Sequence, residues 1–289
     1  MITKTDAVVL KSMKYRDSSK IVTFYTRRFG KLKGIAKGAR QMKSKFGASL
    51  EPISAVSLIL YKKEHRDLQL ISECDVVTTY KTIHSELDRM AVALSVLELL
   101  NQLTHDEEGN DALYLLLVQT LDEVERAKKN CVNLLFAFEI RCAAVFGFAP
   151  NLEVCLACHR SLDDIGSGGS AVFQLSRGAV LCSRCGQSAK VTKSDNPPLN
   201  PTRSKVGTAW RPDEGNTRVS VETLKTLQRL LTAPLDTVSS LELSSAQGNE
   251  IDGTLRLYLR QHFEDLKPLK SMEILKNYTI LGSKPSGRS

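Results

Sequence analysis

NLEVCLACHR, at residues 151–160, places Cys155 and Cys158 in a C-x-x-C pair that His159 follows directly. C-x-x-C-H is the attachment motif of c-type haem, whereas C-x-x-C alone is half of a common zinc site. A second pair, Cys182 and Cys185, follows with 23 residues between the two pairs. Two pairs at such a separation are typical of a structural zinc ion held by four thiolates, with no position left for water. The sequence therefore predicts one structural Zn²⁺ per chain, with His159 as a bystander.

The alternatives to zinc match these cysteines less well. A redox-active dithiol remains an alternative for a C-x-x-C pair. A zinc deaminase needs an H-x-E motif, which His84 and Glu86 supply, together with P-C-x-x-C. Val154 stands where that second motif requires proline, and a deaminase would leave the second cysteine pair unexplained.

The composition is that of a cytoplasmic globular protein. The chain has 289 residues, of which 42% are hydrophobic and 25% charged, and this length suits two or three domains. We expect no signal peptide and no contact with a membrane, because no apolar run approaches the roughly 20 residues of a span. Cytoplasmic thiols stay reduced, which argues against covalently attached haem. The isolated Cys74, Cys131 and Cys142 are expected to be small core residues.

Positive charge is concentrated in the first 50 residues. They hold 13 Lys or Arg against Asp6 and Asp17, a local excess of +11, although the whole chain carries only +8. This asymmetry predicts that the N-terminal part binds a polyanion. Five short β-rich runs, separated by turn-prone segments, predict a small OB-type β-barrel over residues 1–79. Such barrels commonly bind single-stranded nucleic acid.

The periodicity becomes helical from about residue 80. Apolar residues recur three and four positions apart at 87–97, 113–124 and 134–145, and again after residue 218. We expect an α-helical domain at 80–150 and 218–280, interrupted by a four-cysteine module at 151–187 that contains a hairpin. The polar, proline-rich stretch at 188–217 is expected to be a flexible loop. The predicted fold class is therefore α+β and multidomain.

A basic, glycine-containing segment, KLKGIAKGARQMKSKFG at residues 31–47, carries the strongest binding signal. Its closely spaced cations could contact successive phosphates and bind nucleic acid with little sequence preference. The candidates are Lys31, Lys33, Lys37, Arg40, Lys43 and Lys45. The alternative is a solvated, lysine-rich face.

Catalytic motifs are absent from the sequence. It contains no G-x-x-x-x-G-K-[ST], no G-x-G-x-x-G after a strand, no H-E-x-x-H and no G-x-S-x-G. We therefore expect a binding protein rather than an enzyme, with no catalytic residues and no nucleotide.

The order of basic barrel, helical region and four-cysteine motif resembles the RecO family of bacterial recombination mediators. The likeness is carried by AKGARQMKSKFGASLEP at 36–52, FEIRCAAVFGFAPNLEVCLACH at 138–159 and LKPLKSMEIL at 266–275. It covers nearly the whole chain, but the long loop at 188–217 is not expected in the family.

The resemblance implies a DNA repair and homologous recombination mediator of the cytoplasm, associated with the nucleoid. Such a protein binds single- and double-stranded DNA, anneals complementary strands and helps RecA to load onto DNA coated by single-stranded DNA-binding protein (SSB). RecR and the C-terminal tail of SSB are the implied protein partners. The family's DNA contacts carry over to Lys37, Arg40, Lys43 and Lys45, and then to Arg16, Lys20, Arg27 and Arg28.

Two other functions remain open at this point. A zinc-containing OB-fold protein could bind RNA instead of DNA. A scaffold could use the same basic face to bind an acidic protein.

Overall fold

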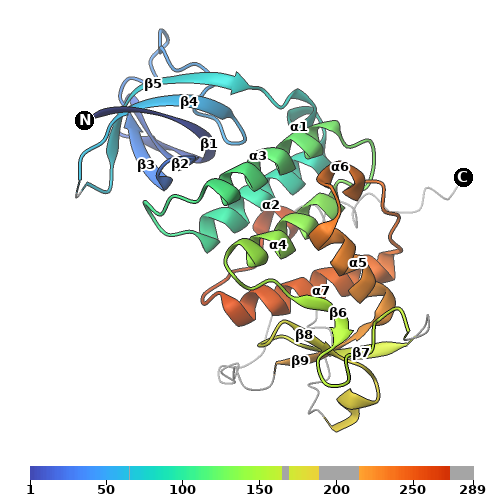
Figure 1. The fold of residues 1–289 in the computed structure, drawn as a ribbon. Coiled ribbons are helices and arrows are strands. Elements are labelled where there is room, and N and C mark those ends of the chain that lie inside the picture. Colours follow the sequence, from blue (N-terminus) through green and yellow to red (C-terminus); the bar gives the residue numbers. More distant parts are fainter. Residues whose placement is uncertain (65, 165–168, 189–214, 274–289) are drawn as a thin grey trace, which may run out of the picture. The chain divides into compact units, whose positions relative to one another are not determined.

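The computed structural model describes residues 1–64, 66–164, 169–188 and 215–273 (Figure 1). The chain forms two compact units, one of Met1–Phe138 with Lys267–Ser289 and one of Glu139–Leu266. The domain bounds expected from the sequence stay a prediction. Most of the loop expected at 188–217 lies outside the described residues, as does the chain after residue 273.

The first unit begins with a five-stranded β-barrel. Its strands are β1 (Ile2–Tyr15), β2 (Ser19–Thr26), β3 (Gly30–Ala36), β4 (Ala55–Tyr61) and β5 (Gln69–Thr78). They pair in the order β1-β2-β3-β5-β4, and β4 pairs again with β1. The expected OB-like sheet domain and its five strands are confirmed.

The long strand β1 closes this barrel because it pairs with two neighbouring strands. Its first half pairs with β4 and its second half with β2, with a shift of register between Val9 and Lys11. Alternate residues such as Val22 and Phe24 are fully buried and fill the interior. The contact between β3 and β5 is short and parallel, at Gly34–Gln69 and Ile35–Leu70.

Three helices follow the barrel in the first unit: α1 (Lys81–Ser85), α2 (Leu87–Leu103) and α3 (Asp111–Arg126). The expected apolar stripe of α3 is buried, and Asn110 caps this helix by accepting a hydrogen bond from the Leu113 N–H at 3.0 Å. The division between the units falls within α4 (Val132–Val145). None of the helices in the described ranges is long and apolar enough to span a bilayer.

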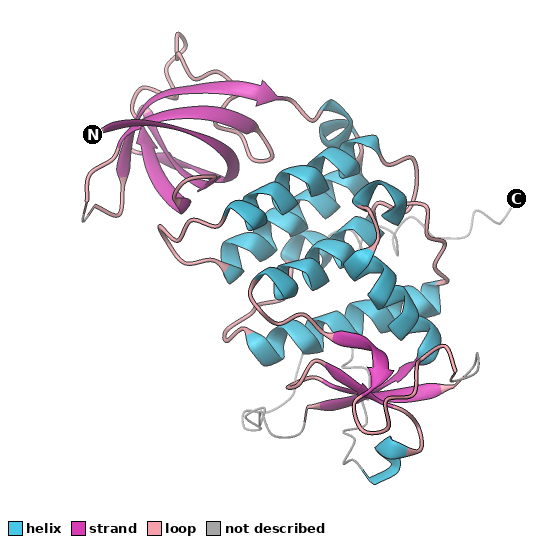
Figure 2. Cartoon of the chain, viewed as in Figure 1, coloured by secondary structure: helices cyan, strands magenta, loops and turns pink. Residues whose placement is uncertain are grey.

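The second unit combines a small sheet with helices, drawn in magenta and cyan in Figure 2. The sheet has the order β6-β8-β7-β9, and α5 contacts β6, β9 and α7. The strands are β6 (Asn151–Cys155), β7 (Ser170–Gln174), β8 (Ala179–Leu181) and β9 (Asn216–Ser220). A 3-10 helix (Cys185–Ser188) follows β8, and the later helices are α5 (Val221–Thr232), α6 (Leu235–Val238) and α7 (Ser245–His262).

The sheet is larger than the single hairpin expected from the sequence. That hairpin is present as β7 and β8, which pair from Val172–Leu181 to Gln174–Ala179. Strand β9 was not expected, and it pairs with β7 along its whole length, from Ser170–Ser220 to Gln174–Asn216. The chain therefore returns to the cysteine-bearing sheet directly after the residues that are not described.

Candidate metal centre and nucleic-acid interface

The four predicted cysteines lie together in the second unit. Cys155 ends β6 and Cys158 lies in the following turn, while Cys182 follows β8 and Cys185 begins the 3-10 helix. Their sulfur atoms lie within 4.8 Å of one another, and Cys158 Sγ is 3.8 Å from Cys182 Sγ. Four sulfurs arranged tetrahedrally at zinc–sulfur distances have edges of about 3.8 Å. This cluster can therefore hold a metal ion.

The electrostatics of the cluster favour a bound cation. Burial acts to raise the pKa of Cys155, but hydrogen bonds from the N–H groups of Cys182, Cys158 and Ala157 outweigh it and lower the pKa to about 6. Hydrogen bonds with Cys182 and Cys158 raise the pKa of Cys185 to about 12. Thiolates this close repel one another, so without a cation the cluster disfavours the ionisation of all four thiols. A divalent cation would remove this restriction, because a coordinating thiol is deprotonated outright.

The turns that carry the two cysteine pairs are tightly built. The His159 N–H donates to the Cys155 carbonyl at 2.9 Å, and His159 itself is exposed with a φ of 57°. At Gly186, a Cβ atom would lie 2.7 Å from Val172 Cγ2. His159 therefore closes the first turn, and the second turn packs directly on β7.

Most of the cations predicted to contact DNA, together with Lys62, fall into two groups that differ in their partners. The first group, here called the paired end, forms ion pairs with the acidic segment at 105–111 between α2 and α3. The second group, here called the free rim, has no acidic partner among the described residues. The paired end comprises Arg27, Lys31, Lys33 and Lys62, and the free rim comprises Arg16, Lys37, Arg40, Lys43 and Lys45.

Two of the predicted DNA contacts at the paired end form close ion pairs. Arg27 Nε lies 2.5 Å from Asp111 Oδ1, and Lys33 Nζ lies 2.7 Å from Asp106 Oδ2. The hydrogen bond from Arg27 lowers the pKa of the Asp111 carboxyl below its usual value. These cations are thus already neutralised by carboxylates of the same unit.

The Lys31 side chain is mostly buried and forms hydrogen bonds within the protein. Its Nζ donates to the carbonyls of Asn101, at 2.9 Å, and Thr104, at the C-terminal end of α2. Burial lowers the pKa of Lys31, while nearby Asp106 acts to raise it. A lysine here satisfies carbonyl groups that an α-helix leaves without partners at its C-terminus.

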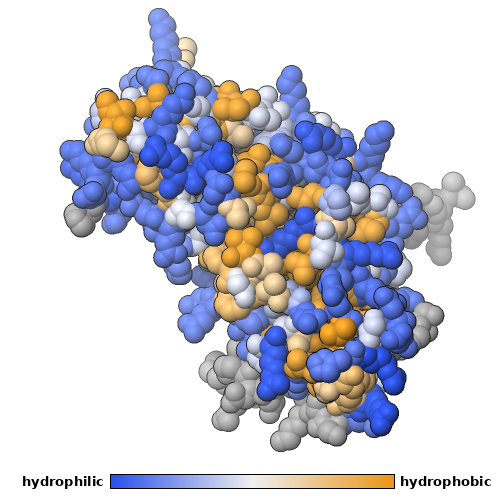
Figure 3. Space-filling view, viewed as in Figure 1, coloured by the Kyte–Doolittle hydropathy of each residue, from blue (hydrophilic) through white to orange (hydrophobic). Residues whose placement is uncertain are grey.

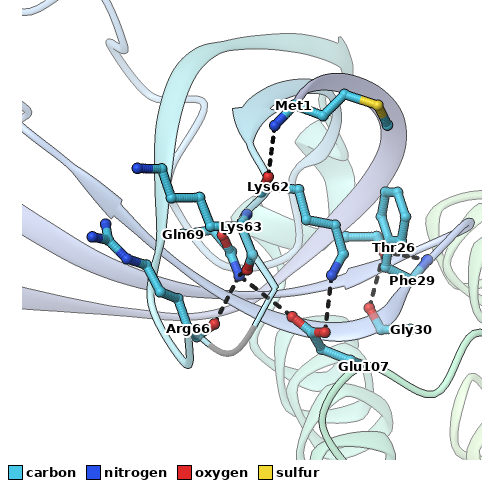
Figure 4. Close-up of polar contacts among 9 residues, drawn as sticks. All are labelled: Met1, Thr26, Phe29, Gly30, Lys62, Lys63, Arg66, Gln69 and Glu107. Atoms are coloured by element: carbon cyan, nitrogen blue, oxygen red, sulfur yellow. Dashed lines mark hydrogen bonds and ion pairs between the residues drawn. The ribbon is translucent and has the colours of Figure 1, made fainter.

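Glu107 connects the same acidic segment to the turn between β4 and β5 (Figure 4). Its carboxylate lies 2.9 Å from Lys62 Nζ and 3.5 Å from Gln69 Nε2. The buried Gln69 side chain also accepts from the Lys63 N–H at 2.9 Å, and the Glu107 N–H donates to the Lys31 carbonyl at 2.7 Å. Side-chain and backbone contacts therefore both hold the segment on the barrel.

Two glycines permit this close approach. Gly30 has a φ of 63°, and a Cβ atom there would lie 1.9 Å from the Glu108 carbonyl oxygen. A Cβ atom at Gly109 would lie 2.7 Å from the Arg28 carbonyl oxygen. The acidic segment thus lies directly on the turn between β2 and β3.

The free rim is held together by hydrogen bonds from the backbone and the side chain of Arg40, which connect two loops. The Arg40 N–H donates to the Ser18 carbonyl at 2.9 Å, and Arg40 Nη1 donates to the Arg16 carbonyl at 2.9 Å. The loop after β3 therefore lies against the turn between β1 and β2. Both segments bring exposed cations to the same place.

Aromatic rings accompany two cations of the free rim. The Arg16 guanidinium lies 5.3 Å from the centre of the Tyr15 ring, and Lys45 Nζ lies 5.4 Å from that of Phe46. Phe46 belongs to the barrel core, so it anchors the loop that carries Lys45.

The two remaining candidates differ from both groups. Lys20 Nζ lies 2.6 Å from Glu51 Oε1, and its side chain is only 19% exposed. Arg28 is exposed, with Nη1 3.4 Å from the Lys4 carbonyl and the guanidinium 5.3 Å from the Phe29 ring centre. Among the predicted DNA contacts, the structure thus leaves the free rim and Arg28 as the cations that a polyanion could contact without displacing a carboxylate.

Comparison with known proteins identifies the family. The family described as "Recombination protein O N terminal" matches residues 1–80, and "Recombination protein O C terminal" matches residues 84–194 and 182–273. The chain belongs to the RecO family. DNA repair protein RecO of Chloroherpeton thalassium is 32% identical over 95% of this chain and 98% of its own length. DNA repair protein RecO of Salinibacter ruber is 30% identical over 100% of this chain and 98% of its own length.

Membership of the RecO family confirms the expected class of protein. The two matched regions span the barrel and nearly all of the described remainder, including all four cysteines. The chain is thus a RecO-family DNA repair protein with a cysteine cluster able to hold a metal ion.

Sequence reasoning missed the pairing of the RecO barrel with its own acidic segment. The sequence does contain a signal, because HDEEGND at 105–111 is the densest acidic run near the helical stripes. It gives no indication, however, that this run meets cations about 75 residues earlier in the chain.

Proposed function

We propose that this protein is a recombination mediator that binds single- and double-stranded DNA through the free rim of its barrel. In this role it anneals complementary strands and helps RecA to load onto SSB-coated DNA. It acts as a binding protein without catalytic chemistry or nucleotide, in the cytoplasm and next to the nucleoid. The observation that carries the proposal is the free rim, a group of exposed cations with no acidic partner in the described ranges.

The free rim suits a phosphate backbone better than the paired end does. A phosphate that binds Lys37 or Arg40 displaces only water and condensed counterions, which favours binding at low salt. A phosphate that binds Arg27 or Lys33 must compete with Asp111 or Asp106. We therefore place the DNA on Arg16, Lys37, Arg40, Lys43 and Lys45, and we leave the paired end outside the contact.

Zinc is the metal that we propose for the four cysteines. Four thiolates in a tetrahedral arrangement favour zinc or an iron–sulfur cluster, and the 3.8 Å separation of two sulfurs fits a single zinc ion. With all four positions supplied by Cys155, Cys158, Cys182 and Cys185, the ion is structural and stabilises the small sheet.

The protein partners that we propose, RecR and the acidic C-terminal tail of SSB, rest on the family resemblance. A synthetic SSB tail peptide should bind with micromolar affinity, and removal of its terminal phenylalanine should weaken binding. Titration calorimetry together with fluorescence anisotropy checks this, and no binding by both methods would count against the SSB partner.

The test of DNA binding compares two variants that lose the same charge. Lys37→Gln with Arg40→Gln should weaken binding to all sequences about equally and reduce the slope of log K against log salt by roughly one to two units. Arg27→Gln with Lys33→Gln should leave that slope unchanged, because those cations are paired with carboxylates.

The outcomes separate the remaining functions. An unchanged salt slope in the Lys37 and Arg40 variant would show that the free rim is only a solvated face. Stronger competition by single-stranded RNA than by single-stranded DNA of equal length would instead support an RNA-binding function. No nucleic-acid binding at all in a filter assay would leave a scaffold for an acidic protein.

A further inference from the structure

A row of apolar side chains runs around the outside of the barrel, across all five strands. Each member lies opposite the next in the strand register, so neighbouring side chains lie side by side. We call this row the apolar ladder. It consists, in spatial order, of Ile2, Tyr61, Leu70, Ile35, Ile21 and Met13.

The ladder faces outward because its members alternate with core residues. Val22, which follows Ile21, is fully buried, and Ile71, which follows Leu70, is nearly so. Met13 is 46% exposed, and Ile21, Ile35 and Leu70 are partly exposed. In the surface view the barrel is mainly hydrophilic, with small hydrophobic patches between the polar side chains (Figure 3).

The two ends of the ladder lie beside different charges. Met13 lies three residues before Arg16, which directly follows β1, and Ile35 lies two residues before Lys37, which directly follows β3, so this end of the ladder adjoins the free rim. Tyr61 is followed by Lys62, which is paired with Glu107. The two ends are separated by about 35 Å along β1, from Ile2 to Met13.

We infer that the Met13–Ile21–Ile35 part of the ladder contacts unpaired bases and makes the barrel prefer single-stranded over double-stranded DNA. This inference rests on the proposed function, since it requires the phosphates to lie on the free rim. A single strand held there can turn the apolar faces of its bases toward the ladder, and sequence-independent contacts of this kind are typical of single-strand binding. A duplex offers the rim the same phosphates, but its bases are stacked inside the helix.

Charge complementarity favours single-stranded DNA over an apolar protein segment as the ligand of this part of the ladder. The apolar residues at this end are bordered by the cations of Arg16, Lys37 and Arg40, none of which has an acidic partner in the described chain. A ligand with both flat apolar surfaces and regular negative charges fits such a border, and single-stranded nucleic acid has both.

The test is the ratio of single-strand to duplex affinity in Met13→Gln with Ile21→Thr. We expect about a threefold to tenfold loss of affinity for single-stranded DNA, less than a twofold loss for duplex, and an unchanged salt slope. The matched control is Ile2→Thr with Tyr61→Gln, which removes similar side chains at the other end of the same ladder and should leave both affinities unchanged. Met13→Gln alone, at an exposed position, should show the same direction if the double variant folds poorly.

The results distinguish this inference from the proposed function. Equal losses on both DNA forms, or no loss on either, would overturn the inference. If the Lys37 and Arg40 variant nevertheless shows the reduced salt slope, the proposed function still stands. If neither variant changes DNA binding, both are wrong.

Discussion

Cys158 is the exposed member of the cysteine cluster, yet its sulfur lies 3.8 Å from that of Cys182. Cys158→Ser should lose the bound metal and destabilise residues around 150–190, because metal binding supplies folding free energy to a small module. Elemental analysis and thermal unfolding check this. Cys131→Ser, which changes a lone, partly exposed cysteine, should keep the full metal content. A full zinc content in Cys158→Ser would exclude the proposed site.

Gly30 is the residue on which the acidic segment at 105–111 packs most closely. Gly30→Ala should lower the free energy of unfolding by about 3 kcal/mol, because it adds both an unfavourable positive φ and a clash with the Glu108 carbonyl. Gly47→Ala also has a positive φ but meets nothing within 4 Å, so it should cost only about 1 kcal/mol. Denaturant unfolding measures the loss of unfolding free energy in both variants. Equal losses would show that the close approach at Gly30 is unimportant.

The short helix α1 begins without a cap of its own and uses Glu125 of α3 instead. The Glu125 carboxylate accepts hydrogen bonds of 2.9 Å from the N–H groups of both Thr82 and Ile83. Burial acts to raise the pKa of Glu125, but these bonds outweigh it and lower the pKa below the usual 4.5. The ionised form is therefore the one that stabilises the helix start.

Glu125→Gln should accordingly cost about 1–2 kcal/mol at neutral pH. Because the folded pKa lies below the unfolded one, this contribution is complete above about pH 4.5 and is lost as the pH falls further. The difference in unfolding free energy between the variant and the unchanged protein should thus shrink toward pH 3. Glu123→Gln, whose partner is the exposed Arg126, should cost less than about 0.5 kcal/mol. A difference that is independent of pH would contradict this account.

For the whole molecule, the proposed function predicts annealing that needs no nucleotide. Base pairing drives the reaction, and the protein must only reduce the repulsion between two phosphate backbones. Annealing of SSB-coated complementary strands should therefore proceed without ATP, depend little on sequence and fall steeply between about 50 and 200 mM salt. A gel or fluorescence assay measures the rate. A requirement for ATP, or a rate insensitive to salt, would contradict the mechanism.

The local parts of this molecule could be predicted from its sequence. The five barrel strands follow from β-rich runs between turns, and the cysteine cluster follows from the spacing of two pairs. The strands depend on residues that are close together in the sequence. The cluster depends on cysteine thiolates at a spacing that is typical of a metal site.

The parts that depend on distant contacts could not be predicted. Strand β9 is short and follows a polar stretch, and its assignment as a strand depends on pairing with β7. Counting charges treats Lys33 and Lys37 alike, but only the fold shows that Asp106 neutralises Lys33. The division of the cations into a paired end and a free rim therefore required the structure.

The short parallel contact between β3 and β5 has a consequence for motion. Since these strands meet only at Gly34–Gln69 and Ile35–Leu70 in the described barrel, few backbone hydrogen bonds must break to part them. Local openings of a protein occur where such bonds are fewest, so amide protons along this seam should exchange with deuterated solvent sooner than those between β1 and β2. Uniform protection around the barrel would contradict this. Ile35, on one side of this seam, belongs to the part of the apolar ladder that we propose to contact bases, so a bound single strand should slow that exchange.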